Sequence, residues 1–331
     1  MDQGLLKTTI LGTGRALPER IMTNYDLEKI VDTSHDWIVS RTGIEQRHVA
    51  DEHTATSDLA TEAGKKALEK AGIKAEDLDL IIVATCTPDS PNFPATACIV
   101  QHNLGAKKAG AFDLETACSG FLYGMTIADQ FIKNGMYKYV LVIGAETMTK
   151  ILNWEDRNTC VLFGDGAGAA VFGPSEDGSG ILSAELGSDG AGGDSLIVPA
   201  GGSRMPATAE TVEKKLHTIA MDGSEVFKFA VRTMGGASKR VLEKAGLGVE
   251  DVDFLVPHQA NVRIIANAAK RLKLDMDKVM VNLDKYANTS GATIPMALDE
   301  ALEQGRIKKG DHVVLVGFGA GLTWGASVIK W

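Results

Sequence analysis

The sequence predicts an α/β fold in which two similar halves each hold a mixed, mainly parallel sheet. Near-continuous apolar runs, typical of strands buried on both faces, alternate with segments of helical periodicity. An internal repeat is the second observation, because residues 68–72 (LEKAG) recur as residues 242–246, a shift of 174 residues. The same shift carries the apolar run at residues 140–142 onto residues 314–316. A repeat of this length indicates two α/β domains rather than a solenoid. The predicted domains are residues 1–174 and residues 175–331.

Strands and helices are expected to alternate along both halves. The segment Thr56-Ser57-Asp58 is typical of a helix start, and Gly72 is typical of a helix end. In the first half we expect strands at residues 7–11, 78–85, 111–114, 139–143 and 169–172, and helices at residues 56–70, 94–104 and 120–134. The first strand should end at a turn formed by Gly12-Thr13-Gly14. In the second half the clearest strand patterns lie at residues 254–256, 279–282 and 314–316.

Composition and charge limit the possible classes of function. The chain has 331 residues, of which 44% are hydrophobic and 23% charged, as in ordinary globular proteins. Its net charge of −9 argues against a nucleic-acid partner, and no segment is long and apolar enough to span a bilayer. Residues Met1 to Gly4 lack the pattern of a signal peptide, so we expect a cytoplasmic protein with reduced thiols. No metal is expected, because the four cysteines lack metal-binding spacing.

Cys118 is the first candidate for chemistry, because it lies where a predicted strand turns into a helix. The free N–H groups and the dipole at a helix N-terminus favour thiolate over thiol, so we expect a lowered pKa for Cys118. The alternative is a buried structural thiol, which is the commoner fate of a free cysteine. The repeat bears on this choice. The shift of 174 places Ala292 at the equivalent position, so the turn itself does not require sulfur.

Two further polar residues follow predicted strands. His258 comes directly after the apolar run at residues 254–257, and Asn288 follows the run at residues 279–282 after a short connection. Ligands of α/β sheets bind beyond the carboxyl ends of the strands, so Cys118, His258 and Asn288 are expected in one cleft between the halves. The alternatives are a histidine bonded to a backbone carbonyl and an asparagine that only serves a turn.

Six segments together resemble one family. They are DWIVSRTGI at residues 36–44, TACSGF at 116–121, FGDGAG at 163–168, PHQAN at 257–261, NTS at 288–290 and GFGAGLTWG at 317–325. In this order, and over nearly the whole chain, they resemble β-ketoacyl-acyl-carrier-protein synthase III, the initiating condensing enzyme of bacterial fatty-acid synthesis in the thiolase-like superfamily. The resemblance implies a thiolase-like fold with five αβαβα layers and a Cys-His-Asn triad formed by Cys118, His258 and Asn288.

The reaction implied by the resemblance has two stages. Cys118 takes the acyl group of a short acyl-CoA, and malonyl-acyl-carrier-protein then loses CO2 to give an enolate that attacks the acyl-cysteine. His258, through a ring N–H, and Asn288, through its amide, would stabilise charge on the malonyl thioester oxygen. This role needs no general base, which agrees with the lack of a catalytic carboxylate motif. No cofactor is implied, because acyl-CoA is a substrate.

The resemblance also implies binding residues. The backbone N–H groups of Cys118 and Ala320 would form the oxyanion hole, although many relatives have glycine in place of Ala320. The implied CoA-binding residues are Thr33, Trp37, Arg41, Arg157 and Asn261. The implied acyl-pocket residues are Phe93, Phe163 and Phe318. In the family the residue at Phe93 reaches into the partner subunit, which implies a homodimer. Because the carrier protein is acidic, we expect docking on Lys228, Arg263, Lys270 and Arg271, whose alternative is a solvated helix face.

Other functions remain as alternatives. A primer-loading condensing enzyme of a polyketide or alkylquinolone pathway would share every motif. Degradative thiolases use a second catalytic cysteine near the C-terminus, but no cysteine follows Cys160. Hydroxymethylglutaryl-CoA synthases use a catalytic glutamate, for which no matching segment is found. A binding module that kept the fold without the reaction is the non-enzymatic alternative.

Overall fold

The computed structural model describes residues 6–331 and contains two sheets. The first has the strand order β1-β7-β6-β4-β5, and the second the order β11-β12-β13-β8. The strands of the first sheet are β1 (Thr8–Ala16), β7 (Asp165–Pro174), β6 (Val140–Thr147), β4 (Leu80–Ala84) and β5 (Gly110–Leu114). Those of the second are β11 (Phe254–Pro257), β12 (His312–Gly319), β13 (Thr323–Lys330) and β8 (Gly180–Ser188). Residues Met1 to Gly4, used above to argue against a signal peptide, lie outside the described residues.

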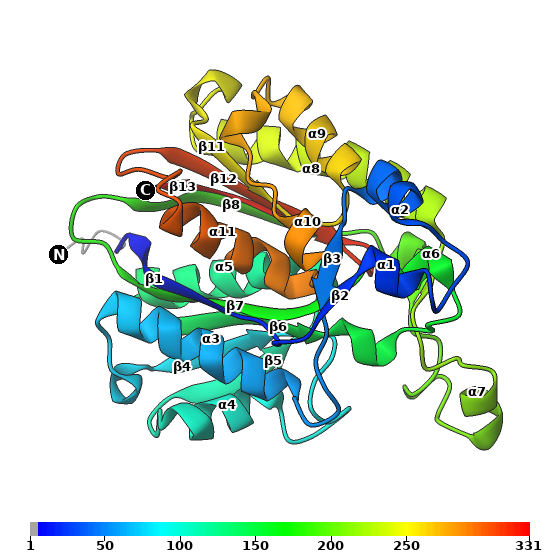
Figure 1. Ribbon diagram of the computed structural model, residues 1–331. Helices are drawn as coiled ribbons and strands as arrows, with labels where there is room; N and C mark the ends of the chain where they lie inside the picture. Colours follow the sequence, from blue (N-terminus) through cyan, green and yellow to red (C-terminus); the bar gives the residue numbers. More distant parts are fainter. Residues whose placement is uncertain (1–5) are drawn as a thin grey trace.

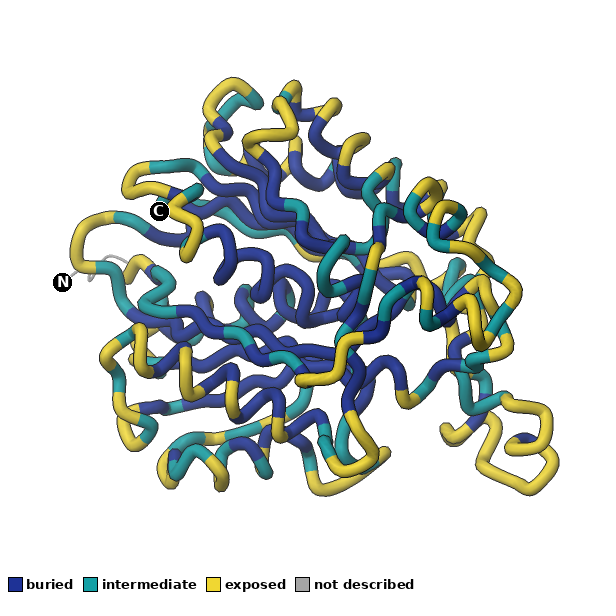
Figure 2. The backbone as a smooth tube through the Cα atoms, viewed as in Figure 1, coloured by how far each residue is buried: buried dark blue, intermediate teal, exposed yellow. Residues whose placement is uncertain are grey.

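Helices and sheets form five layers (Figure 1). The long helices are α3 (Thr56–Ala71), α4 (Thr96–Leu104), α5 (Gly120–Lys133), α8 (Gly223–Lys244), α9 (Val262–Arg271) and α11 (Thr293–Glu303). The first sheet has α3 and α4 on its outer face, α5 and α11 lie between the sheets, and α8 covers the outer face of the second sheet together with α9. The central layer is the most buried part of the molecule (Figure 2). The predicted α/β fold with mixed sheets is therefore confirmed.

Shorter elements surround this body. They are the helices α1 (Asn24–Leu27), α2 (His35–Thr42), α6 (Arg157–Cys160), α7 (Ala209–Glu213) and α10 (Leu283–Tyr286), and the strands β2 (Ile21–Thr23), β3 (Gln46–His48), β9 (Leu196–Ile197) and β10 (Ala220–Met221). The pairs β2–β3 and β9–β10 form small separate sheets. Among residues 6–331 no helix has the length and apolar character needed to cross a bilayer.

The two sheets have the same internal arrangement. The pairs β1–β7 and β7–β6 are antiparallel, whereas β6–β4 and β4–β5 are parallel. In the second sheet β8–β13 and β13–β12 are antiparallel and β12–β11 is parallel. A single parallel bridge from Leu255 of β11 to Val279 takes the place that β5 has in the first sheet. The division of the chain at residue 174 stays a prediction.

The first predicted strand is longer than the sequence pattern indicated. Gly12 and Gly14 were expected to form a turn, but both belong to β1. A Cβ atom at Gly12 would collide with the backbone of Ala71, and one at Gly14 with the backbone at Ala63. These glycines therefore allow α3 to pack closely on the strand, so their role is close approach rather than chain reversal.

Candidate active site

Cys118 lies in a 3₁₀ turn, Ala117–Ser119, between the end of β5 and the start of α5. The equivalent turn of the second half is Ser290–Ala292, before α11, and both turns begin with a residue of left-handed backbone, with φ of 46° at Ala117 and 48° at Ser290. Cys118 is therefore equivalent to Gly291. The predicted equivalence with Ala292 is wrong by one residue, because the shift at this turn is one residue shorter than in the strands.

The side chain of Cys118 faces a cavity of about 350 Å³ that both halves line. Cys118 itself is only 5% exposed. Loss of water raises the pKa of the Cys118 thiol to about 12, and the charge of the nearby Glu146 acts in the same direction. The expectation of a lowered pKa is therefore wrong. Cys118 rests as a neutral thiol, and its attack on a substrate requires an acceptor for the proton.

Ser290 connects all three residues of the predicted triad. Its hydroxyl oxygen lies 3.5 Å from Cys118 Sγ, and its backbone N–H donates to Asn288 Oδ1 at 2.9 Å. Its carbonyl oxygen lies 3.1 Å from the hydroxyl of Thr293, which in turn lies 2.6 Å from His258 Nδ1. The structure thus brings the thiol, the amide and the imidazole together around one serine that the sequence analysis quoted only as part of a motif.

The amide of Asn288 has a defined orientation. A backbone N–H can only donate, so the atom that faces Ser290 N must be the carbonyl oxygen of the Asn288 side chain. The backbone of Asn288 is held between Leu162 and Gly164 of the first half. The Nδ2 group is therefore left to donate a hydrogen bond to a substrate.

His258 follows β11 and is almost completely buried. Burial lowers the pKa of its imidazole to about 3, so the ring is neutral. The Thr293 hydroxyl has one proton and two possible acceptors, the Ser290 carbonyl and His258 Nδ1. When this proton points to His258 Nδ1, the ring carries its own proton on Nε2 and can donate from there. When it points to Ser290, Nε2 is an acceptor. Thr293 therefore controls the tautomer of His258.

The chain after β12 passes close to the nucleophile. A Cβ atom at Gly319 would lie 2.6 Å from the backbone nitrogen of Cys118, so only glycine allows this approach. The next residue, Ala320, lines the cavity beside Cys118. The pairing of these two backbone N–H groups as an oxyanion hole stays a prediction.

The three predicted acyl-pocket phenylalanines occupy different surroundings. Phe163 lines the cavity. Phe318 is instead packed edge-on against His258, with ring centroids 5.3 Å apart. Phe93 is 85% exposed and does not line the cavity of its own chain. The apolar wall formed by residues 196–198 and Ile219 was not predicted, although the apolar run Leu196-Ile197-Val198 was a detectable signal in the sequence.

The predicted CoA-binding residues gather at α2. The guanidinium carbons of Arg157 and Arg41 lie 5.1 and 5.6 Å from the centroid of the Trp37 ring. Asn261 begins α9 and donates to the carbonyl of Arg41 at 3.0 Å. The hydroxyl oxygen of Thr33 is buried and has no hydrogen-bond partner within residues 6–331. Stacked planar groups and an unpaired hydroxyl suit a nucleotide.

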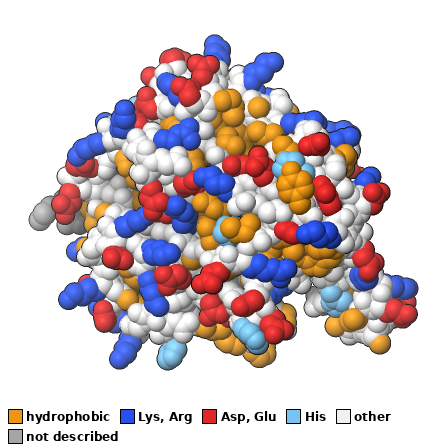
Figure 3. Space-filling view, in the orientation of Figure 1, with side chains coloured by type: hydrophobic (Ala, Val, Ile, Leu, Met, Phe, Trp, Pro, Cys, Tyr) orange, Lys and Arg blue, Asp and Glu red, His pale blue; other side chains and the backbone are white. Residues whose placement is uncertain are grey.

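The predicted docking residues are exposed on α8 and α9. Lys228 forms an ion pair with Glu225, whereas Arg263 donates to the carbonyl of Ser40 at 2.9 Å and thereby joins α9 to α2. Lys270 and Arg271 lie in the last turn of α9. In Figure 3, Lys and Arg side chains gather near α2 and the neighbouring part of α9.

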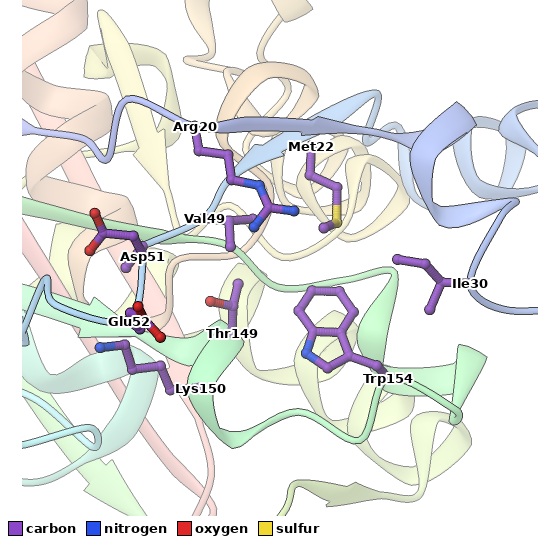
Figure 4. A pocket seen from close by; sticks show the side chains of 10 residues that line it. Arg20, Met22, Ile30, Val49, Asp51, Glu52, Thr149, Lys150 and Trp154 are labelled. Atoms are coloured by element: carbon purple, nitrogen blue, oxygen red, sulfur yellow. The ribbon is translucent and has the colours of Figure 1, made fainter.

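A second hollow, of about 480 Å³, lies beyond the 3₁₀ turn Met148–Ile151 (Figure 4). Met148 and Ile151 line the cavity of Cys118, whereas Thr149 and Lys150 line this second hollow. The hollow is lined by both basic and acidic side chains, among them Arg20 and Glu52, and by apolar side chains, among them Trp154. It contains none of the predicted site residues.

Glu146, near the end of β6, is a buried carboxylate that the sequence analysis did not single out. Its carboxylate accepts hydrogen bonds from the hydroxyls of Thr85 and Thr87 and from the backbone N–H of Cys86 and Gly291. The available signal was its place at the C-terminal end of a central strand, where functional groups of α/β sheets gather.

The chain matches two family models, 3-oxoacyl-[acyl-carrier-protein] synthase III over residues 112–190 and the C-terminal part of that synthase over residues 242–331. It is 66% identical to the β-ketoacyl-[acyl-carrier-protein] synthase III of Caldanaerobacter subterraneus subsp. tengcongensis, over 97% of both chains. The structure resembles 3-oxoacyl-[acyl-carrier-protein] synthase III from Aquifex aeolicus, with a TM-score of 0.90 and 49% identity over 98% of this chain and 100% of the other. The priming β-ketosynthase of the R1128 polyketide pathway also matches with a TM-score of 0.90, at 35% identity over 98% and 97%.

Proposed function

The chain belongs to the β-ketoacyl-[acyl-carrier-protein] synthase III family, and from that premise we propose which residues carry out each step of the reaction. The enzyme condenses an acyl-CoA with malonyl-acyl-carrier-protein, with loss of CO2, and so starts fatty-acid synthesis. The assignment of residues rests on one observation, the hydrogen-bonded connection of Cys118, Asn288 and His258 through Ser290 and Thr293. A priming enzyme of a polyketide or alkylquinolone pathway has less support, because the higher identities are to the fatty-acid family.

In the first step Cys118 attacks the acyl carbonyl of the acyl-CoA. The backbone N–H groups of Cys118 and Ala320 stabilise the oxyanion, and loss of one such donor typically costs about 3 kcal/mol of barrier. Collapse of the intermediate breaks the bond to the CoA sulfur and leaves an acyl-cysteine, and CoA leaves as a thiol, so that it gains one proton for the one that Cys118 has lost. The proposed reaction uses no cofactor.

In the second step the malonyl thioester loses CO2, and charge develops on its carbonyl oxygen. Asn288 Nδ2 donates to this oxygen, since its Oδ1 already accepts from Ser290. His258 Nε2 donates as well, in the tautomer that requires the Thr293 hydroxyl to point at Nδ1. Two donors in a buried site stabilise the enolate without a general base. The enolate carbon then attacks the acyl-cysteine, and collapse of the tetrahedral intermediate breaks the bond between the acyl carbon and Sγ of Cys118. The released thiolate takes up a proton from solvent, which restores the thiol.

Acyl loading of the unmodified protein tests this proposal. Incubation with acetyl-CoA alone is expected to add one acetyl group, found by peptide mass spectrometry on Cys118. The free thiols Cys86, Cys98 and Cys160 serve as internal controls and should stay unmodified. An adduct on another cysteine would contradict the assignment of Cys118, and no adduct at all would favour a binding module that kept the fold without the reaction.

For CoA we propose a site at Trp37, Arg41, Arg157, Thr33 and Asn261. The adenine would lie between the indole of Trp37 and the guanidinium of Arg157 after these two groups, 5.1 Å apart in this structure, have separated to admit the ring. Aromatic stacking of one base is worth about 1–3 kcal/mol. Trp37→Ala is therefore expected to raise the KM for acetyl-CoA about tenfold with little change in kcat. An acetyl thioester that lacks the nucleotide is the control, because both proteins should use it equally. An equal loss with both substrates would show that Trp37 acts on the fold instead.

A homodimer is the proposed assembly. Phe93 and Phe112 are exposed apolar side chains, and Phe112 belongs to β5, the edge strand of the first sheet. Exposed large apolar groups beside an unpaired strand edge favour pairing with a second chain. In that arrangement Phe93 reaches the partner's acyl pocket, which fits its absence from the cavity of its own chain. We also propose that the enzyme is cytoplasmic.

For the acidic carrier protein we propose docking on Arg263, Lys270 and Arg271 of α9, with Lys228 of α8 at the edge of the surface. Arg263 links α9 to α2 and hence to the proposed CoA site. Lys270 and Arg271, at the end of α9, would therefore hold the carrier protein near the proposed CoA site, through which its pantetheine arm would enter. Such contacts act mainly on the association rate and on its salt dependence.

A further inference from the structure

The cavity beside Cys118 has a largely apolar wall that contains one charged side chain. Much of the wall is formed by the side chains of Phe163, Leu196, Ile197, Val198 and Ile219. Among residues 6–331, Glu115 is the one residue with a charged side chain that lines this cavity, and no basic side chain lines it. An acyl group that enters the cavity therefore meets an apolar wall and a single carboxylate, with no cation beside it.

The local backbone holds the carboxylate of Glu115 close to the nucleophile. Glu115 directly follows β5 and comes just before the 3₁₀ turn that contains Cys118. Its Oε1 accepts a hydrogen bond at 3.1 Å from the backbone N–H of Ala117, the residue before Cys118. Glu115 is exposed, so this hydrogen bond rather than burial fixes the place of its carboxylate. A carboxylate in contact with water is ionised at neutral pH, and the cavity therefore has one negative charge in its wall.

This charge acts on the reacting sulfur. Burial is the main cause of the raised pKa of the Cys118 thiol, and the charges of Glu146 and Glu115 raise that pKa further. Glu146 is buried and does not line the cavity, so Glu115 is the carboxylate that an entering acyl group meets. A field that opposes negative charge on the sulfur also opposes negative charge on an acyl group bound beside it.

The residues proposed to bind the malonyl thioester lie outside this cavity. Neither His258 nor Asn288 is among the residues of the described chain that line it, whereas Cys118 is. The cavity is therefore the place of the acyl group, and the malonyl group of the carrier protein belongs on the side of Cys118 that faces His258 and Asn288. A charge in the cavity wall acts first on the choice of acyl-CoA.

Resting on the proposed function, we propose that Glu115 determines specificity by rejecting acyl-CoA substrates whose acyl group itself carries a carboxylate, such as malonyl-CoA. All acyl-CoA substrates share the nucleotide and the pantetheine arm, so only the acyl end can distinguish them. The apolar wall disfavours a carboxylate because it removes water without supplying a hydrogen-bond donor. Glu115 adds a repulsion between like charges, which grows as the acyl carboxylate approaches. Uncharged short acyl groups meet neither obstacle.

Malonyl-CoA and isovaleryl-CoA are a matched pair of substrates for testing this proposal. The isopropyl end of the isovaleryl group has nearly the size and branching of a carboxylate but no charge. The measurement is single-turnover acylation of Cys118 by each substrate and by acetyl-CoA at low ionic strength, followed by mass spectrometry. A malonyl-CoA labelled at its methylene carbon allows an acetyl adduct formed by later loss of CO2 to be counted as malonyl loading.

Glu115→Gln is expected to raise the rate of acylation by malonyl-CoA about tenfold relative to isovaleryl-CoA, which corresponds to about 1.4 kcal/mol. The rates with acetyl-CoA and isovaleryl-CoA should be nearly unchanged. Glutamine keeps a side-chain oxygen that can accept from the N–H of Ala117, so the change removes the charge and retains the hydrogen bond. Glu115→Asp is the matched control, because it keeps the charge and should keep the preference of the natural protein.

Salt provides a second measurement that needs no change of sequence. The Debye length falls from about 30 Å at 0.01 M salt to about 3 Å at 1 M, so salt screens an exposed charge such as that of Glu115. The ratio of malonyl to isovaleryl loading should therefore rise with salt in the natural protein and stay constant in Glu115→Gln. Contacts to the CoA part cancel in this ratio, since both substrates carry it.

The proposal is overturned if Glu115→Gln leaves the ratio of malonyl to isovaleryl loading as it is in the natural protein, or if neither protein is acylated by malonyl-CoA. It is also overturned if the variant changes acylation by all three substrates by one factor, because Glu115 would then act only on the shape of the turn. Failure of the proposed function gives a different result, since the natural protein would then form no adduct on Cys118 even with acetyl-CoA.

Discussion

Replacing Cys118 by serine is expected to abolish acyl transfer, with a loss of at least about 10⁴-fold in turnover. A serine hydroxyl ionises far less readily than a thiol and is a much weaker nucleophile, and removal of a nucleophile from a cooperating set costs nearly the whole of its effect. The measurement is the release of 3-oxoacyl-acyl-carrier-protein, together with the mass of the protein after incubation with acetyl-CoA. No acyl adduct should form.

Cys98→Ser is the control for this experiment. Cys98 is the exposed thiol of the four, and its change should leave both the adduct and the turnover as they are in the natural protein. If Cys118→Ser retained more than a few per cent of the activity, sulfur at this position would be dispensable and the acyl-cysteine route would fail.

His258→Ala is expected to reduce decarboxylation of malonyl-acyl-carrier-protein by about 10²–10³-fold while acetylation of Cys118 stays largely intact. The imidazole is neutral, because burial lowers its pKa to about 3, so it contributes as a hydrogen-bond donor to the enolate rather than as a cation. Removal of one such preorganised donor typically has an effect of this size. Release of labelled CO2 and the acetylation of the protein should be followed in parallel on one preparation.

The two half-reactions discriminate between the possible roles of His258. An equal loss of acetylation and decarboxylation would mean that the imidazole accepts the Cys118 proton, with Nε2 unprotonated and the Thr293 hydroxyl turned to Ser290. Asn288→Ala provides a comparison, because its amide is held as a donor in either tautomer. If Asn288→Ala loses decarboxylation and His258→Ala does not, His258 does not stabilise the enolate.

Much of the site follows from local sequence. Cys118 and His258 each follow a strand with a clear apolar pattern, and carboxyl ends of strands meet at one edge of an α/β sheet. The strand predicted at residues 279–282, before Asn288, is wrong: this segment forms only a single bridge, from Val279 to Leu255, and α10 follows it. The repeat could be recognised from identical short segments, because both copies of a duplicated fold need similar residues at helix C-termini and in buried strands. The lengths of β1 and β7 could not be predicted from the sequence, because a glycine that allows a helix to pack closely on a strand cannot be distinguished in sequence from a glycine in a turn.

What lies behind the site could not be obtained from the sequence. Glu146 and Gly291 are 145 positions apart in sequence and become hydrogen-bonded only when the chain folds, so no local pattern relates them. The cavity wall at residues 196–198 and Ile219 is formed in the same way, by segments outside every quoted motif. Phe93 is exposed and does not line the cavity of its own chain, which depends on the path of the surrounding loop and not on its own residue type.

The sequence by itself determined the α/β class and the duplication and named Cys118, Asn288 and His258 as candidate reacting groups, because these depend on periodicity and on short runs of residues. The tertiary structure alone decided the charge state of those groups. Cys118 lies at the start of a helix, which favours a thiolate, but packing removes its sulfur from water and sets a carboxylate nearby, so that the neutral thiol prevails. Solvation is a property of all surrounding atoms, and they come from both halves of the chain.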